Sequence, residues 1–257
     1  MIGMGVFGQG FVGKLAFPSA NVSDRLEKTF TSVNFNMMIM VIYALITIAI
    51  FGMWYYARYE GNFLPSPKKT FNPMMLVAIV ILVPGTQFAA NFIANLTGYI
   101  RPDWLQQYNE LFETSGITDT TFVTVLYSVI LAPICEELIF RGVTMRCARK
   151  ALPFALANLM QAALFGLFHL NWIQGIYAFA LGIVLGYVCE CGGSIYYSMW
   201  LHLLFNLWGT LSGFFPDPGN SVVICVIVIA VTIVSLVVGF VLFNKGRRKL
   251  PINSTGI

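Results

Sequence analysis

The sequence is poor in charge. Only 10% of its 257 residues are Asp, Glu, Lys or Arg, while 58% are hydrophobic. A soluble domain carries roughly 25% charged residues. The composition therefore excludes an ordinary soluble enzyme and predicts an all-α fold, a polytopic transmembrane helix bundle in the lipid bilayer. The net charge of +4 is small and no basic stripe with interleaved aromatic residues occurs, so nucleic acid is not an expected partner.

Several signatures of membrane proteases are also missing. All four aspartates lie outside the apolar segments, which excludes a pair of membrane aspartates. Neither H-E-x-x-H nor G-x-S-x-G occurs, which disfavours a zinc-protease helix and a nucleophilic serine elbow. The five cysteines are odd in number and lie mostly in or beside apolar segments, so they do not indicate a disulfide framework.

What the sequence does contain is a series of apolar segments near the ~20 residues that a helix needs to cross a bilayer. We predict about seven transmembrane helices, and an eighth if residues 1–20 also cross. The seven segments are 35–57, 73–97, 121–143, 153–170, 173–190, 194–213 and 221–243.

Basic residues outside these segments predict the orientation. With seven spans, ten of them fall on one side of the membrane, and basic loops are typically cytoplasmic. We therefore expect a multi-pass protein of the cell membrane with a cytoplasmic C-terminus. The ten residues are Arg58, Lys68, Lys69, Arg146, Arg149, Lys150, Lys245, Arg247, Arg248 and Lys249.

Three charged residues lie clearly inside one span: Glu136, Glu137 and Arg141. Charge inside a bilayer is costly, so such residues indicate a function. Glu137 and Arg141 are four residues apart and share a helix face, so they can neutralise each other as an ion pair. Glu136 is rotated by about 100° from Glu137, which leaves its carboxylate available. A purely structural cluster that locks helices together is the alternative.

Both histidines of the chain also fall on apolar segments. His169 ends the fourth span, and His202 lies in the sixth with Asn206 one helical turn later. A bundle that brought these residues to Glu136 would combine a carboxylate, two imidazoles and an amide at low dielectric. Such a set suits activation of a water molecule and stabilisation of an oxyanion.

These residues also form three motifs in order. E-E-x-x-x-R stands at Glu136–Arg141, F-x-x-x-H at Phe165–His169 and H-x-x-x-N at His202–Asn206. Over residues 120–212 the chain resembles the CAAX protease and bacteriocin-processing family of intramembrane glutamic endopeptidases, also called the abortive-infection-like family. The remaining segments resemble nothing specific.

The resemblance implies an intramembrane endopeptidase that acts on a peptide or membrane-protein substrate without a cofactor or metal ion. Glu136 would be the base on a water molecule, helped by His169. His202 and Asn206 would hold the oxyanion, and Glu137 and Arg141 would support the site. The predicted organisation is an interfacial or flexible segment at 1–34, accessory helices at 35–119, the catalytic core at 120–212, and a last helix with a basic tail at 213–257.

Other functions stay open. Glu136, His169 and His202 form a chemically suitable zinc ligand set, which would make the chain a zinc-dependent protease using the same residues. A non-catalytic immunity or regulatory protein could share the fold. A proton-coupled transporter could use the glutamate and histidines as a relay, but no internal repeat is visible in the sequence.

The predicted spans also raise a question of depth. With straight, full-length helices, Glu136 would lie near the cytoplasmic end of the third span and His169 near the outer end of the fourth. The two could meet only if the 144–153 linker dipped into the membrane or the helices tilted strongly.

Overall fold

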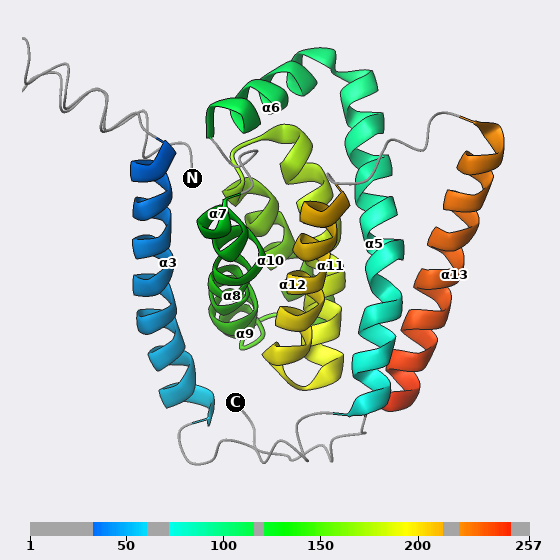
Figure 1. Cartoon of the computed structure of the whole chain (residues 1–257). Coiled ribbons are helices and arrows are strands. Elements are labelled where there is room, and N and C mark those ends of the chain that lie inside the picture. Colours follow the sequence, from blue (N-terminus) through cyan, green and yellow to red (C-terminus); the bar gives the residue numbers. More distant parts are fainter. Residues whose placement is uncertain (1–32, 61–71, 116–120, 213–220, 248–257) are drawn as a thin grey trace, which may run out of the picture.

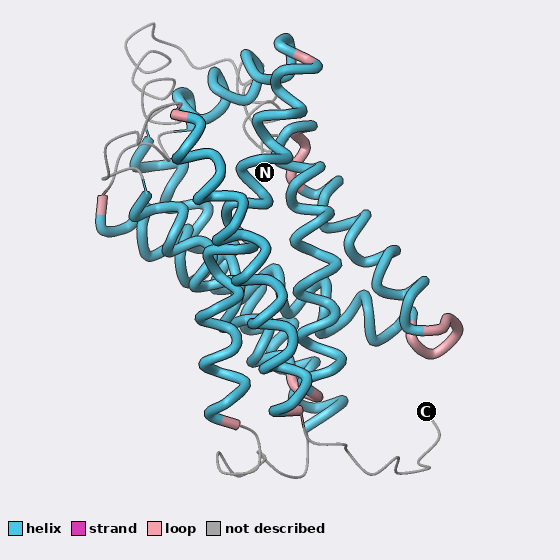
Figure 2. The backbone as a smooth tube through the Cα atoms, turned by 90° about the vertical axis from the view of Figure 1, so that its right-hand side faces the viewer, coloured by secondary structure: helices cyan, strands magenta, loops and turns pink. Residues whose placement is uncertain are grey.

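The computed structural model describes residues 33–60, 72–115, 121–212 and 221–247, and the part of the chain that it describes is helical apart from short turns (Figure 2). The predicted all-α helix bundle is confirmed. The first 32 residues, including the suggested eighth span, and Lys68, Lys69, Arg248 and Lys249 lie outside the described residues.

The helices follow the apolar segments closely. The first part of the chain forms α3 (Val33–Tyr55), η1 (Tyr56–Glu60), α5 (Pro73–Ile100) and α6 (Pro102–Ser115). The third apolar segment is one continuous helix built from α7 (Phe122–Leu126), η2 (Tyr127–Leu131), α8 (Ala132–Glu137), η3 (Leu138–Met145) and α9 (Arg146–Ala148). The rest forms α10 (Phe154–Phe168), α11 (Trp172–Gly192), α12 (Ile195–Ser212) and α13 (Val222–Gly246).

Figure 1 shows α3 on one side of the bundle, α5 and α13 on the other, and α7 to α12 between them. The helix α3 packs on η2, α8 and η3, whereas α5 packs on α11, α12 and α13. Accessory helices from the first part of the chain therefore flank the segment that carries the three motifs.

Five helices among the described residues are long and apolar enough to cross a membrane, so the chain is a multi-pass membrane protein. They cover Phe35–Arg58, Pro73–Ile100, Phe122–Ala148, Trp172–Gly192 and Val222–Gly246. The two other predicted spans form α10 and α12. The helix α10 has 15 residues, or about 22 Å, which is less than the ~30 Å of hydrocarbon in a bilayer. The exact number of spans stays a prediction.

Much of the segment between the second and third predicted spans is helical as well, although its residues are not part of any apolar run. It contains α6, which crosses the top of the bundle in Figure 1. Trp104 of α6 stacks on Trp172 at the start of α11, with ring centroids 5.3 Å apart. The guanidinium of Arg101 lies 4.3 Å from the Trp104 ring and pairs with Asp103 at 2.7 Å. A polar helix of this kind carries no long apolar run, so hydropathy alone misses it.

The helix α5 contains Pro84, and a side chain from α13 enters the helix at that point. The Ser235 hydroxyl accepts a hydrogen bond from the Gly85 N–H at 2.9 Å and donates one to the Ile81 carbonyl. Those two backbone groups would bond to each other in a regular helix. The Ser235 hydroxyl therefore gives both backbone groups a hydrogen-bond partner, which a polar backbone group needs within a membrane. A Cβ on Gly85 would lie 2.7 Å from this hydroxyl, which explains the glycine.

Contacts at the opposite end from α6 tie distant helix ends together. Asn72 caps α5, accepts from the Met74 N–H at 2.9 Å, and donates from Nδ2 to the Gly246 carbonyl at 2.6 Å. Arg146 donates to the Tyr55 hydroxyl at 3.0 Å. The described basic residues at the ends of α3, α9 and α13 thus share one end of the bundle (Figure 1). The cytoplasmic C-terminus stays a prediction.

Candidate active site in the third helix

The centre of the site is the middle of the long helix from Phe122 to Ala148, which forms from the third apolar segment and is here called the third helix. Its α-helical turn α8 carries Glu136 and Glu137 and lies between two π-helical stretches, η2 and η3. Such wide turns inside α-helices frequently mark functional sites. The sequence reading treated this segment as one regular helix and missed both wide turns.

Glu137 and Arg141 form a buried ion pair. Both side chains have 0% exposure, and Arg141 Nη1 lies 2.8 Å from Glu137 Oε1. The same guanidinium donates to the Gly182 carbonyl at 3.3 Å and lies over the Phe165 ring, 4.5 Å from its centroid. The i,i+4 spacing had predicted this pair. Its burial shows that the Arg141 charge is neutralised within the bundle rather than by solvent.

His202 lies between the two glutamates. Its Nδ1 is 2.9 Å from Glu137 Oε1, and its Nε2 is 3.5 Å from Glu136 Oε2. Since an ionised carboxylate can only accept, His202 Nδ1 carries a hydrogen and donates it to Glu137. The opposite edge of the ring then faces Glu136. Adjacent residues of the third helix thus contact the two nitrogens of one imidazole from α12.

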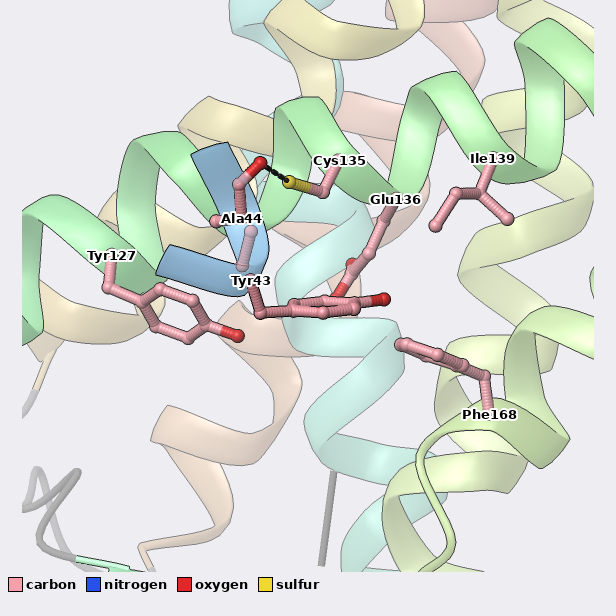
Figure 3. Close-up of a pocket in the computed structure, with 8 residues that line it drawn as sticks. Tyr43, Ala44, Tyr127, Cys135, Glu136, Ile139 and Phe168 are labelled. Atoms are coloured by element: carbon pink, nitrogen blue, oxygen red, sulfur yellow. Dashed lines mark hydrogen bonds between the residues drawn. The ribbon is translucent and has the colours of Figure 1, made fainter. Parts of the chain in front are cut away.

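Glu136 differs from Glu137 in its surroundings. Its side chain is 13% exposed and lines a pocket with Tyr43 and Ala44 of α3 and Phe168 of α10. Figure 3 shows the Glu136 side chain reaching toward the rings of Tyr43 and Phe168. Its neighbour Cys135 lines the same pocket and donates from Sγ to the Ala44 carbonyl at 3.2 Å. The Glu136 carboxylate is therefore partly exposed, whereas Glu137 is fully buried.

The shortness of α10 brings His169 to the depth of Glu136. Glu136 lies 12 residues before the end of its helix at Ala148, and His169 lies 15 residues after the start of α10 at Phe154. A short turn joins the two helices. His169 thus lies at the end of its helix, as expected, but α10 is shorter than a full span, so the two residues can come together without a linker that dips into the membrane.

Phe165 connects the two histidines, a role that the sequence reading missed although it had noted this residue in the second motif. Its ring meets His169 edge-on at 5.0 Å and His202 at 5.7 Å between centroids. His169 is also near enough to Glu136 and His202 to interact with both electrostatically. Its Nδ1 lies 2.8 Å from the Phe165 carbonyl. A carbonyl only accepts, so Nδ1 carries the hydrogen and Nε2 is bare in the neutral ring.

Asn206 lies one turn beyond His202 on α12, and its Nδ2 donates to the Ser128 carbonyl in η2 at 2.8 Å. Ser198, one turn before His202, is fully buried and donates to the Ile195 carbonyl of its own helix at 2.9 Å. Ser198 also lies beside the Glu137 carboxylate, whereas Asn206 joins α12 to the third helix.

The described residues offer no group of three His, Cys, Asp or Glu side chains arranged to hold a metal ion. Glu136, His169 and His202 come near one another, but they do not converge as a ligand set. The zinc alternative therefore gains no support from this geometry.

Comparison with known proteins gives one finding. A family model described as type II CAAX prenyl endopeptidase, Rce1-like, matches residues 118–208. That segment contains all three motifs and the helices η2 to α12 that hold them, so the resemblance to CAAX proteases is confirmed there. No curated protein and no solved structure gives a significant match.

Proposed function

We propose that this chain cleaves a peptide bond in or near the membrane with a water molecule activated by Glu136, in line with the match of residues 118–208 to the family model of type II CAAX prenyl endopeptidases. The match supports a membrane endopeptidase in general terms. The mechanism below is supported by one observation above all. Of the two adjacent glutamates, Glu137 is held in a buried ion pair, whereas Glu136 faces His202 and lines a pocket.

The two carboxylates have separate tasks. Glu137 accepts from Arg141 and His202 at 2.8 and 2.9 Å and has no exposure, so no water molecule can reach it. Glu136 is partly exposed, so it can take a proton from a water molecule positioned for attack. His169 helps, because its bare Nε2 can accept a hydrogen bond or a proton on that side of the site.

His202 acts as a donor in the protonated state. With Nδ1 committed to Glu137, only an imidazolium also carries a hydrogen on Nε2, where an oxyanion would need it. The two glutamates, Arg141 and a charged His202 sum to zero, which is the favourable state for a cluster within a bilayer. The imidazolium then stabilises the negative charge that develops on the carbonyl oxygen of the substrate.

Asn206 supplies the second donor. Its amide carries two hydrogens, and the bond to the Ser128 carbonyl uses one of them. The second hydrogen can reach an oxyanion held beside His202 Nε2. Arg141 takes no part in the chemistry, but it keeps Glu137 ionised and so keeps His202 oriented.

The test is cleavage of a library of membrane-tethered reporter peptides by purified protein in liposomes. We expect Glu136→Gln to abolish cleavage and His202→Ala to lower kcat by about 10²–10³ with a small change in KM. Glu190→Gln is the matched control, because Glu190 pairs with Arg149 at 3.0 Å at the surface.

The same assay separates the alternatives. Cleavage that persists in a chelator supports the glutamate mechanism, whereas loss in chelator with recovery in zinc would assign the same residues to a metal site. A folded wild type that cleaves nothing, together with a Glu136→Gln protein that keeps the cellular phenotype, would support the non-catalytic immunity or regulatory role.

A further inference from the structure

The carbonyl of Ser128 has lost its backbone partner inside the third helix. In an α-helix its partner would be the N–H of Ala132, but that group bonds to the Tyr127 carbonyl in the π-helical register. In the π register the partner would be residue 133. That residue is Pro133, which has no N–H. Neither register can therefore satisfy this carbonyl from within the helix.

Asn206 of α12 replaces the missing donor. Its Nδ2 lies 2.8 Å from the Ser128 oxygen, across a sequence separation of 78 residues. A backbone acceptor without a partner is costly at this depth, so the bond has a strong reason to persist. On one helix the bond lies one turn after His202, and on the other it lies two turns before Glu136. It therefore ties together the two elements whose side chains face each other in the site.

We propose that Pro133 is a positioning residue: by removing an amide it reserves the Ser128 carbonyl for Asn206, and this bond sets the approach of Glu136 to His202. The claim that Pro133 affects catalysis rests on the proposed function. The claim that Pro133 leaves the Ser128 carbonyl to Asn206 does not.

The π-helical turn η2 explains how the bond between Asn206 and the Ser128 carbonyl affects the direction of the Glu136 side chain. Each residue of an α-helix turns by about 100°, so a change of register upstream alters the face onto which every later side chain points. Pro133 lies only three residues before Glu136. A regular ladder through residues 128–133 would rotate α8 relative to α12, and the 3.5 Å approach of Glu136 Oε2 to His202 Nε2 would be lost.

Pro133→Ala tests the idea, because alanine returns the missing N–H. In the π register residue 133 would then bond to Ser128, and in the α register Ala132 would do so. Either outcome competes with Asn206. We expect kcat to fall by about 10–100-fold, since small misplacements of reacting groups have effects of that order. KM should change little, and the protein should stay folded.

A double-mutant cycle of thermal unfolding in detergent gives the decisive readout. Asn206→Ala alone should lower the unfolding midpoint, because the Ser128 carbonyl loses its donor. Pro133→Ala added to Asn206→Ala should raise that midpoint again, because the restored amide satisfies the carbonyl. Pro84→Ala is the matched control: it also returns an N–H to a membrane helix, but it should give no such rescue.

Each result points one way. Equal midpoint shifts for Pro133→Ala in the wild-type and Asn206→Ala backgrounds would overturn the proposed bond. Rescue of stability together with an unchanged kcat for Pro133→Ala would overturn the positioning role. If the wild type cleaves no peptide, the proposed function fails. A rescue of the Asn206→Ala unfolding midpoint by Pro133→Ala would still support the claim that Pro133 leaves the Ser128 carbonyl to Asn206.

Discussion

Replacement of Glu137 by Gln should damage both stability and catalysis. The substitution keeps the shape of the side chain but removes its charge. Arg141 then stays fully buried, with its counter-ion lost and only the 3.3 Å bond to the Gly182 carbonyl and the Phe165 ring around it. His202 loses the carboxylate that accepts from Nδ1 at 2.9 Å, so its ring is no longer held in the same orientation.

The geometry sets the size of the effect. For unit charges 2.8 Å apart, Coulomb's law gives roughly 6 kcal/mol at an effective dielectric constant of 20. Relaxation and the amide's own hydrogen bonds recover part of this energy, and removal of one partner from a buried pair typically costs about 3–5 kcal/mol. For a chain of this size that corresponds to a fall of roughly 6–20 °C in the unfolding midpoint.

The assay is thermal unfolding in detergent beside peptide cleavage. Glu190→Gln breaks the surface pair with Arg149 and should change stability by less than about 1 kcal/mol. The double variant Glu137→Leu, Arg141→Met should recover much of the stability, because it removes both charges. It should stay inactive, because His202 still lacks its carboxylate. A Glu137→Gln protein as stable as the wild type would refute the buried pair.

Two further substitutions, each with a control substitution, test the packing between helices. Gly186→Ala should lower the free energy of unfolding by about 1–3 kcal/mol, because its Cβ would overlap Asn158 Oδ1. Gly209→Ala is the control and should be neutral, because the nearest atom to its Cβ would be 3.7 Å away. Denaturation in mixed detergents measures both, and equal effects would count against the tight contact between α10 and α11. Ser235→Val should weaken the attachment of α13 to α5 by about 1 kcal/mol. Thr232→Val should not, because Thr232 bonds within its own helix. Protease accessibility of α13 reports the difference, and equal accessibility in the two variants would contradict the role of Ser235 in joining α13 to α5.

Hydropathy was sufficient to predict the helices of the bundle, because an apolar run of about 20 residues has few other uses. It was insufficient for α6, where polar residues at 102–115 form a helix through contacts such as the Trp104–Trp172 stack. It located α10 well, because the predicted segment 153–170 matches Phe154–Phe168. An apolar segment shows where a helix can form, but the depth it reaches depends on where the flanking turns lie.

The ion pair of Glu137 and Arg141 was predictable, because it depends on local spacing alone. The position of His202 between both glutamates was not, since it depends on how α12 packs against the third helix. The wide turn at η2 left one signal in the sequence, Pro133, but a proline does not reveal which carbonyl it frees. The catalytic roles of Glu136, His169, His202 and Asn206 stay predictions.

The bridge of Ser235 into α5 has a consequence for the order of assembly. Ser235 is made 150 residues after Gly85, so α5 enters the membrane long before its partner exists. During that interval the Gly85 N–H and the Ile81 carbonyl can be satisfied only by each other, because a bilayer offers no other partner. The nascent α5 is therefore a more regular helix than the mature one. When α13 packs against α5, the bond between Gly85 and Ile81 is replaced by two bonds to the Ser235 hydroxyl. The irregular backbone beside Pro84 therefore forms only after the last helix has been made.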